Sequence, residues 1–447
     1  MKTIFKKIIA YILQIESRLV LFRYKPKIIA ITGSVGKTST KDAVYAVLSK
    51  VSHVRKANKN YNSEIGLPLT ILGIPNGWNN PFIWLLNVLK GLWLFINPFK
   101  SSQYPKWLVL EVGVGHPGDM RRTASWLKTD VVIITAIGET PAHIEFFTSR
   151  KHLIEEKSKL IKTLKKPARN ASSIADAGGG GFLILNADDE DVSKMKNLSK
   201  SRIITYGFKE GADILGSGVD ILYATTSEPT GIIFRVDSDG KSLPVIIEGV
   251  FGRNHVYASM AALALSSVLK LNMLEAIDAL KNYDVPSGRM RLLKGINDSM
   301  IIDDTYNSSP FACESALETL REVKFGERKI AVLGDMLELG KHTVEAHKNI
   351  GRMAKEKCDA LVVVGPRAKA IKEGALETGM NEASFFEFLD SSQAGEFMKT
   401  FIQKGDLVLV KGSQGMRMER VVEAILFDKE NKNKLLVRQD DEWLKKK

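Results

Sequence analysis

The sequence has few cysteines, and their placement does not suggest a metal site. Cys313 and Cys358 are the two cysteines in 447 residues, and neither lies in a Cys-x-x-Cys motif or a Cys/His cluster. A disulfide framework and a structural zinc site are therefore not expected. This usage is typical of a reducing compartment, so we expect a cytoplasmic protein in which both thiols are buried as small apolar side chains.

The sequence also lacks an uncharged apolar run long enough to cross a membrane. The first apolar run, residues 8–13, is followed at once by polar and charged residues, and no small-residue cleavage site follows it. We therefore expect neither a signal peptide nor a membrane span here. We expect residues 1–26 to form an amphipathic helical segment on the domain surface, with a peripheral membrane anchor as the alternative.

A second apolar segment, residues 81–99, approaches the ~20 residues of a membrane span. Asn87 and Lys90 lie near its middle, and proline stands near both ends. We favour a helix that is buried or faces a partner, within an insertion at residues 76–105 of the first domain. Weak attachment of residues 81–99 to a membrane surface is the alternative.

The excess of basic residues has no concentrated block. The chain has 64 Lys and Arg against 51 Asp and Glu, a formal net charge of +13. No run of basic residues is interleaved with aromatic ones, so we expect no nucleic-acid partner, and phosphate sites account for part of the surplus. At roughly 100–200 residues per domain, the length predicts two to four domains.

Short apolar runs alternate with helical patterns along residues 27–285. This alternation predicts an α/β domain with a mostly parallel sheet covered by helices. The expected buried strands are residues 27–32, 107–112, 130–135 and 181–185. Residues 203–250 have a β-like composition, and residues 254–269 have helical spacing. Residues 165–181 are rich in small residues and predict a mobile loop inside this domain.

A domain boundary is expected near residues 286–289. Beyond it, apolar strand candidates recur at residues 329–333, 360–364 and 407–410, with helical segments between them. Residues 286–430 therefore predict a second, Rossmann-like α/β domain of ordinary size. Residues 431–447 are rich in charge and predict a surface helix with a frayed tail.

A glycine loop carries the strongest chemical signal. Residues 33–38 read Gly-Ser-Val-Gly-Lys-Thr, directly after an expected strand and at the start of an expected helix. Backbone N–H groups and the helix dipole there favour a phosphate group. Lys37 would reach the β- and γ-phosphates of ATP, and the Thr38 hydroxyl would bind Mg²⁺. The residues predicted to bind the nucleotide in this loop are Gly33, Ser34, Val35, Gly36, Lys37, Thr38 and Ser39.

The loop lacks the first glycine of a general phosphate-binding loop, since Ile31 stands there. The compressed form Thr-Gly-Ser-Val-Gly-Lys-Thr-Ser, residues 32–39, resembles the Mur ligase superfamily, which includes the peptidoglycan ligases and folylpolyglutamate synthetase. The Asn-rich stretch at residues 60–70 resembles it too. Residues 295–310, 333–340 and 410–419 resemble the branch that adds D-alanyl-D-alanine to UDP-N-acetylmuramoyl-tripeptide. The resemblance spans about residues 27–423.

The resemblance implies an ATP-dependent ligase with small-molecule substrates. A carboxylate attacks the γ-phosphate of ATP, and an amine then displaces phosphate from the acyl phosphate. The implied cofactors are ATP and Mg²⁺, and we expect a monomer. The alternatives are a Mur-type ligase for another carboxylate–amine pair, a P-loop kinase and a nucleotide-gated, membrane-associated binding protein.

The resemblance also assigns residues to roles. The implied magnesium ligands are Thr38, Glu111, His143 and, if it is carbamylated, Lys157. The implied catalytic residues are Lys37, His143 and Lys157. Those implied to hold the nucleotide across the domain junction are Asn254, His255, Arg289 and Asp304. Those implied to meet the substrates are Asn60, Asn62, Asn307, Lys411 and Ser413.

The sequence departs from the family pattern at several places. About 30 residues precede the loop, fewer than the ~50 of a small domain, so we expect the usual N-terminal UDP-binding domain to be absent. Ala136 stands where the family often has asparagine, and Thr140-Pro141 are extra residues before His143. Asn254-His255 reverses the usual order. These changes bear on the carboxylate substrate more than on the ATP chemistry.

Overall fold

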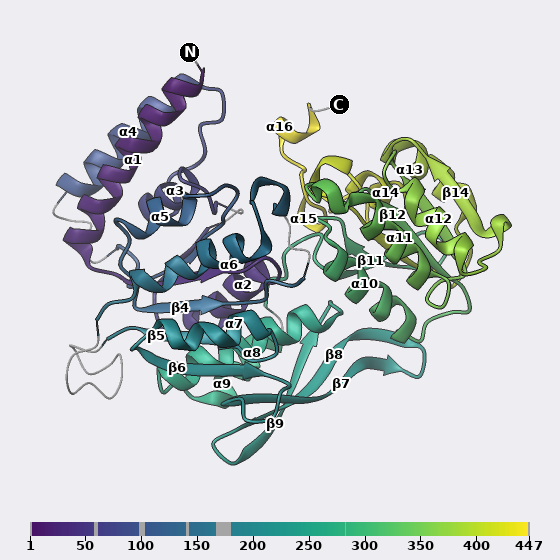
Figure 1. Cartoon of the computed structure of the whole chain (residues 1–447), viewed down its shortest axis with the longest axis horizontal. Coiled ribbons are helices and arrows are strands. Elements are labelled where there is room, and N and C mark those ends of the chain that lie inside the picture. The colour runs from purple at the N-terminus through teal and green to yellow at the C-terminus, as the bar shows by residue number, and fades with distance from the viewer. Residues whose placement is uncertain are drawn as a thin grey trace.

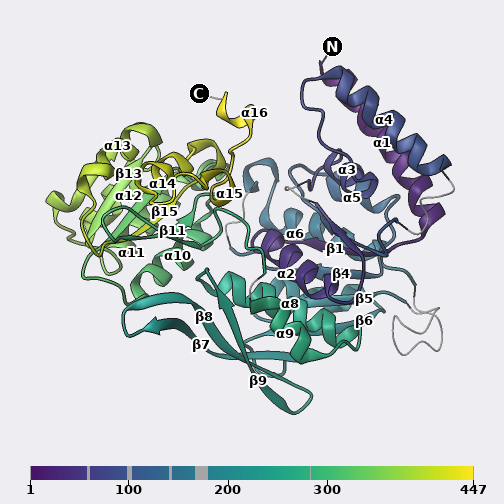
Figure 2. The same cartoon turned by 180° about the vertical axis from the view of Figure 1, so that it is seen from behind.

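The computed structural model describes residues 2–57, 61–97, 103–139, 143–166, 180–281 and 283–445. Figures 1 and 2 show two α/β units side by side, with the chain running from the first unit into the second. The α/β class predicted from the alternation of apolar runs and helical patterns is confirmed.

The described part of the first unit contains a nine-stranded sheet in the order β2-β3-β1-β4-β5-β6-β7-β8-β9. Neighbouring strands from β2 to β7 are parallel, and β7, β8 and β9 form an antiparallel extension. The strands are β1 (Lys27–Thr32), β2 (Val54–Lys56), β3 (Trp107–Glu111), β4 (Val131–Ile134), β5 (Phe182–Asn186), β6 (Arg202–Gly207), β7 (Ile214–Thr225), β8 (Glu228–Ser238) and β9 (Lys241–Glu248).

Helices cover both faces of this sheet. The helices of this unit are α1 (Lys2–Tyr24), α2 (Lys37–Ser49), α3 (Gly66–Leu72), α4 (Pro81–Ile96), α5 (Asp119–Ala124), α6 (Arg150–Ser158), α7 (Glu190–Lys194), α8 (Arg253–Val268) and α9 (Met273–Lys281). Alternate residues of β1 enter two different cores, because successive side chains of a strand point to opposite faces. Ile29 and Ile31 pack with α2 and α8, whereas Ile28 and Ala30 pack on the side of α1, α3 and α4.

The described part of the second unit contains a six-stranded sheet in the order β10-β11-β15-β12-β13-β14. Only β10 pairs antiparallel among these strands. The strands are β10 (Arg291–Lys294), β11 (Met300–Asp304), β12 (Lys329–Gly334), β13 (Ala360–Val364), β14 (Phe385–Phe388) and β15 (Leu407–Lys411). The helices are α10 (Pro310–Glu322), α11 (Thr343–Ala354), α12 (Lys369–Glu377), α13 (Ser391–Phe401) and α14 (Glu419–Ile425).

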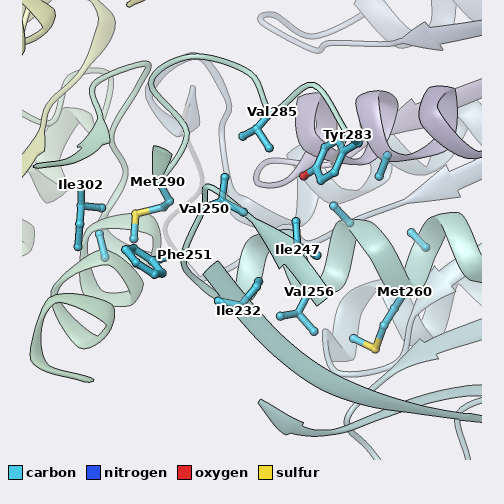
Figure 3. Packing of buried hydrophobic residues seen from close by; sticks show 14 of the residues in the cluster. Ile232, Ile247, Val250, Phe251, Val256, Met260, Tyr283, Val285, Met290 and Ile302 are labelled. Carbon is cyan, nitrogen blue, oxygen red and sulfur yellow. The ribbon is translucent and has the colours of Figure 1, made fainter. Parts of the chain in front are cut away.

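An apolar core runs across the junction between the two units. Phe251 and Met290 lie against each other, with Ile302 of β11 beyond them (Figure 3). The backbone is bonded across the same place, since Phe251 N–H donates to Met290 O at 3.0 Å and Leu292 N–H donates to Gly249 O at 3.0 Å. The two units therefore meet through a packed contact at the start of β10.

Two segments differ from what the sequence predicts. Residues 431–445 do not form one surface helix with a frayed tail: they form α15 (Lys432–Leu435) and α16 (Asp441–Leu444), with Leu436 and Arg438 buried against the second unit. The apolar helix α4, expected to be buried or to face a partner, is not buried, since most of its large side chains are exposed; its partner-facing position stays a prediction. Most of the loop expected at residues 165–181 lies outside the described residues. Both cysteines are buried and unpaired, as predicted.

Candidate active site

Two glycines shape the loop between β1 and α2. Gly36 has φ +83° and precedes the first residue of α2, and Gly33 has φ +149°. A Cβ on Gly33 would lie 2.0 Å from Oγ1 of Thr135, so the close approach requires glycine. The loop therefore places the N-terminus of α2 at the carboxyl end of the parallel strands, where an anion is favoured.

Part of the loop is bonded to the segment that follows β4. The N–H groups of Ser34 and Val35 donate to the carbonyl of Ala136 at 2.7 and 3.1 Å, and Thr135 Oγ1 donates to Val35 O at 2.6 Å. The sequence predicted that the N–H groups of this loop bind a phosphate. In this conformation the amides of Ser34 and Val35 are instead bonded within the protein. The remaining phosphate donors are the first-turn N–H groups of α2, which have no acceptor within the helix.

Two lysines converge on one carbonyl oxygen of this loop. Lys37 Nζ donates to Gly33 O at 2.9 Å and Lys157 Nζ donates to the same oxygen at 3.0 Å. Burial lowers the pKa of the Lys157 ammonium well below its ordinary value, and the neighbouring charge of Lys37 lowers it further. Burial also lowers the pKa of Lys37, with Glu111 opposing and Arg289 reinforcing the shift. The two predicted catalytic lysines are therefore adjacent.

A carboxylate at the end of β3 lies beside the loop. Glu111 is buried; it accepts from Thr38 Oγ1 at 3.0 Å and from Asn62 Nδ2 at 3.1 Å. Because β1 and β3 are parallel neighbours, their carboxyl ends meet at one edge of the sheet. The structure thus brings together three predicted residues from segments that are far apart in the sequence.

The second unit contributes an arginine to this cluster. Arg289 Nη2 lies 3.5 Å from Thr38 Oγ1, and its guanidinium lies 4.0 Å from the centre of the Tyr306 ring. Its backbone carbonyl accepts from Nε2 of His255 at 2.7 Å, so Nδ1 of that ring accepts from Tyr283 Oη at 2.6 Å. Burial lowers the pKa of His255 to about 4. His255 is therefore a neutral residue that fixes the backbone of Arg289.

Asp304 and Lys411, predicted for different ligands, form a buried ion pair. Lys411 Nζ lies 2.5 Å from Asp304 Oδ2 and also donates to Asn307 O at 3.0 Å. The preceding carboxylate, Asp303, accepts from the N–H of Gly288 at 3.1 Å. Burial raises the pKa of Asp303 to about 6. This cluster at the end of β11 holds the chain at the domain junction.

The remaining predicted residues occupy varied positions. Ser413 is buried and its Oγ accepts from the N–H of Leu337 at 2.8 Å. Asn254 lies in the first turn of α8, and its side chain is partly exposed. Asn60 lies outside the described residues, as do Thr140 and Pro141. The roles predicted for these side chains stay predictions.

His143 bridges the two units. Its Nδ1 lies 2.6 Å from Glu338 Oε2, and both side chains are partly exposed. The ring of His143 lowers the pKa of Glu338 through a side-chain hydrogen bond. Within the described ranges, no group of three or more His, Cys, Asp and Glu residues could hold a metal ion. The predicted role of His143 as a metal ligand therefore stays a prediction, and the contact shown is with the second unit.

A large cavity of about 1410 Å³ opens beside the cluster. Thr38 and Arg289 are among the residues that line it. Its walls also include Lys6 and Trp84 of the helices α1 and α4, and Arg438 and other residues of the C-terminal segment. The cavity therefore joins the predicted nucleotide loop to elements from both ends of the described chain.

Comparison with known proteins decides the family. The Mur ligase middle domain matches residues 31–83 and 95–266, and the Mur ligase glutamate ligase domain matches residues 288–414. The chain belongs to the Mur ligase family. It is an ATP-dependent ligase that forms amide bonds, as the loop and its resemblance predict. The middle-domain match omits residues 84–94, which lie within α4.

Several Mur ligases resemble the whole chain. UDP-N-acetylmuramoyl-tripeptide–D-alanyl-D-alanine ligase of Bacillus subtilis is 28% identical over 403 residues, which is 90% of this chain and 76% of that protein. The enzyme of the same name from Synechocystis is 28% identical over 407 residues, 91% of this chain and 76% of that protein. The crystal structure of MurF ligase from Thermotoga maritima in complex with ADP has a TM-score of 0.73 at 25% identity, covering 93% of this chain and 83% of that one.

Some residues of this Mur ligase site were not assigned from the sequence. Tyr283 and Tyr306 orient His255 and Arg289, and Glu338 meets His143. Glu338 lies in a stretch that carried the family resemblance, which was an available signal. No sequence signal pointed to Tyr283 or Tyr306, because only the fold brings them to the domain junction.

Proposed function

We propose that this Mur ligase joins the carboxylate of UDP-N-acetylmuramoyl-tripeptide to the amine of D-alanyl-D-alanine. The names of the relatives support this pair of substrates. The carboxylate oxygen bonds to the γ-phosphorus as the bond to ADP breaks, and the amine nitrogen then bonds to the carbonyl carbon as phosphate leaves. We also propose a cytoplasmic monomer, with the ATP-binding domain at residues 27–285 and the ligase domain at residues 286–430.

One observation carries the phosphoryl-transfer step of the proposal: Arg289 from the second unit reaches the glycine loop of the first. It lies beside Thr38, whose hydroxyl donates to Glu111. A guanidinium at this place stabilises charge that develops on a transferring phosphoryl group. Because the arginine is supplied across the junction, the site is complete only when the two units are in contact.

The residues at the end of β3 and the start of α2 fit a magnesium ion. The Thr38 hydroxyl and the buried Glu111 carboxylate are 3.0 Å apart, and both are the hard oxygen donors that Mg²⁺ prefers. We propose that these two residues hold Mg²⁺, which neutralises phosphate charge when it is bound. Lys37 then orients the β- and γ-phosphates, and the N-terminus of α2 binds their oxygens. Asn254 and Asp304 are proposed to complete the nucleotide site.

We further propose that Lys157 is carbamylated. Carbamylation requires an uncharged amine, and burial with the adjacent Lys37 lowers the pKa of Lys157 well below its ordinary value. The product would be an anion next to Lys37, which relieves the repulsion between two ammonium groups. A ¹³C carbamate resonance in protein equilibrated with ¹³CO₂, absent from Lys157→Arg, tests this directly.

We place the amine substrate near the ends of β11 and β15, with Asn307, Lys411 and Ser413. We propose that the carboxylate substrate binds in the cavity and that Asn60 and Asn62 contact it. Tyr306 and Gln414 line the cavity. They are adjacent in sequence to Asn307 and Ser413, respectively. Lys411 Nζ donates to Asp304 Oδ2 and Asn307 O, which leaves one of its three N–H groups for a substrate.

ADP release tests the proposed reaction. The purified chain is given Mg²⁺-ATP with both substrates, and each component is omitted in turn. Lys37→Ala removes the predicted phosphate contact, and Lys50→Ala, at the exposed end of the same helix, is its matched control. Release that needs both substrates, with a new amide detected by mass, supports the proposal. Intact ATP binding without stimulation by either substrate would exclude this pair and direct the search to other carboxylates and amines.

A further inference from the structure

Helices α1 and α4 form a parallel pair at the periphery of the first unit (Figures 1 and 2). Their carboxyl ends are joined, since Tyr24 Oη donates to Leu94 O at 2.7 Å and Arg23 Nη2 donates to Asn97 O at 3.1 Å. Midway along, the carboxyl of Glu16 lies against Gly91. We call these two helices the helix pair.

The outer face of α4 is apolar, unlike that of an ordinary surface helix. Its inner face is formed by the buried residues Trp84, Asn87 and Gly91. The large apolar residues on its outer face are between 45 and 75% exposed. They are Phe82, Leu85, Leu86, Leu89, Leu92, Trp93 and Ile96. Their spacing of three and four residues puts them on one continuous stripe.

Helix α1 carries a second apolar stripe. Its buried residues, including Leu13 and Val20, face the first unit. Its exposed large apolar residues also recur at helical spacing, at Ile8, Tyr11, Ile15, Leu19 and Phe22. The helix pair thus carries an exposed apolar stripe on each of its helices, and monomeric proteins rarely expose large apolar patches without a partner.

The charges on the helix pair are basic. Lys7 and Arg18 on α1 and Lys90 on α4 are exposed. The one acidic residue in the two helices is Glu16, which is buried between them. Within the described side chains, the helix pair therefore exposes apolar and cationic groups without a carboxylate. This combination complements a surface that is apolar inside and anionic outside.

We propose that the helix pair docks the protein onto an anionic lipid bilayer, lying in the plane of the interface. Leucine and aromatic side chains on one face with flanking lysines are the pattern of interfacial helices, and tryptophan and tyrosine favour the headgroup level. A bilayer surface binds basic side chains, whereas the cores of protein–protein interfaces are depleted in lysine. The Mur ligase middle-domain match omits residues 84–94, which contain most of the outer stripe of α4.

Neither helix is built to cross the bilayer. Of the helices among the described residues, none is long and apolar enough for a membrane span. Helix α4 has 16 residues, about 24 Å at 1.5 Å per residue, against ~30 Å of hydrocarbon. Docking flat would keep the Lys90 ammonium in water and place the outer stripe in the lipid boundary.

Docking in this way sets the cavity beside the membrane. Lys6 and Ile9 from α1, and Pro81 and Trp84 from α4, line the cavity at the first turns of the helix pair. The exposed stripes begin in the same turns. The bilayer would therefore lie next to one wall of the cavity without covering the nucleotide loop.

Flotation of the full-length protein with vesicles tests the proposal. Vesicles of phosphatidylcholine with 30% phosphatidylglycerol are compared with phosphatidylcholine alone, at low and high salt. We expect binding to the anionic vesicles, reduced at least tenfold in Leu86→Gln/Leu89→Gln/Trp93→Gln. Lys7→Gln/Arg18→Gln/Lys90→Gln should remove the preference for anionic lipid. The matched control Leu198→Gln/Leu274→Gln/Val344→Gln, at exposed apolar residues elsewhere, should bind as the parent does.

Two further measurements decide what covers the helix pair. Light scattering on the free protein shows whether it self-associates, and Mg²⁺-ATP binding by each variant shows that the fold is intact. Absence of vesicle binding by the parent would overturn the proposal. A dimer of the parent that the Leu86/Leu89/Trp93 variant disrupts, together with absent vesicle binding, would also overturn the proposal. In that case a second copy of the protein covers the exposed face of α4. The result is independent of the identity of the ligase substrates, which the vesicle measurement does not involve.

Discussion

Replacing His255 with phenylalanine tests how the domain junction is held. The ring makes hydrogen bonds to Arg289 O at 2.7 Å and to Tyr283 Oη at 2.6 Å, and the side chain is buried. His255→Phe leaves both partners unsatisfied, and each buried unsatisfied group costs about 1–3 kcal/mol. We therefore expect the free energy of unfolding at pH 8 to fall by about 2–6 kcal/mol.

The pH dependence of this loss is the sharper test. Burial lowers the pKa of His255 from 6.5 to about 4, so between these values the unfolded chain binds the proton that the folded chain excludes. Stability contributed by His255 is therefore present above pH 6.5 and decreases as the pH falls toward 4. At about 1.4 kcal/mol per pH unit, the loss amounts to up to about 3 kcal/mol.

Other buried groups change stability in the opposite direction, so the variant must be compared with the parent at each pH. Burial raises the pKa of Asp303 to about 6 and of Glu16 to about 7. Their stabilising contributions are present at low pH and are lost as the pH rises through those values. The free energies of unfolding of the parent and of His255→Phe are measured by urea titration between pH 4 and 8. The difference between the two at each pH cancels the contributions of Asp303 and Glu16. A difference that stays constant across this range would refute a neutral, buried His255.

Three further changes test other parts of the site and the helix pair. Gly33→Ala should weaken ATP binding at least tenfold in calorimetric titration without loss of helical circular dichroism, because its Cβ would lie 2.0 Å from Thr135 Oγ1; Thr135→Ala in the same chain should restore part of the affinity, and unchanged binding in Gly33→Ala alone would contradict the loop geometry. Lys411→Met should destabilise the protein by about 3–5 kcal/mol, because it leaves the Asp304 carboxylate buried without its cation; the double variant with Asp304→Asn should be more stable than the single one in urea unfolding. Glu16→Gln should raise the free energy of unfolding by about 1–3 kcal/mol at pH 8 and change it little at pH 5, since ionisation of the buried carboxyl is removed; equal effects at both pH values would exclude that cause.

The local sequence carried enough information to place the glycine loop. Gly33, Gly36 and Lys37 lie in six consecutive residues, so their spacing predicted a loop between a strand and a helix. It did not show that the N–H groups of Ser34 and Val35 donate to Ala136 O. Glu111 could be placed at a strand end, and the parallel pairing of β1 with β3 brings it to Thr38. These predictions depend on short segments whose geometry is set by the sheet.

The domain junction depended on contacts that no short segment specifies. The sequence could not show that Asp304 and Lys411 pair with each other, because their contact follows from the pairing of β11 with β15. The C-terminal segment was expected to be frayed on the basis of its charge. Arg438 instead donates to Glu419 Oε2 at 2.8 Å and to the carbonyl of Thr305 at 3.1 Å. A charged side chain is buried there because its partners come from two other segments.

The parallel arrangement of α1 and α4 also constrains the order of events during synthesis. The hydrogen bond between Tyr24 and Leu94 joins residues 70 positions apart, and two strands and two helices lie between them in the chain. At ~5–20 residues per second, ribosomes need roughly 4–14 s to make that stretch. For that interval α1 lacks α4, and until α3 (Gly66–Leu72) is made it also lacks an inner partner, so that Leu13 and Val20 are then uncovered on that side. The nascent helix then exposes apolar side chains on both faces. A partner that binds it at this stage binds it before the ATP-binding sheet has formed.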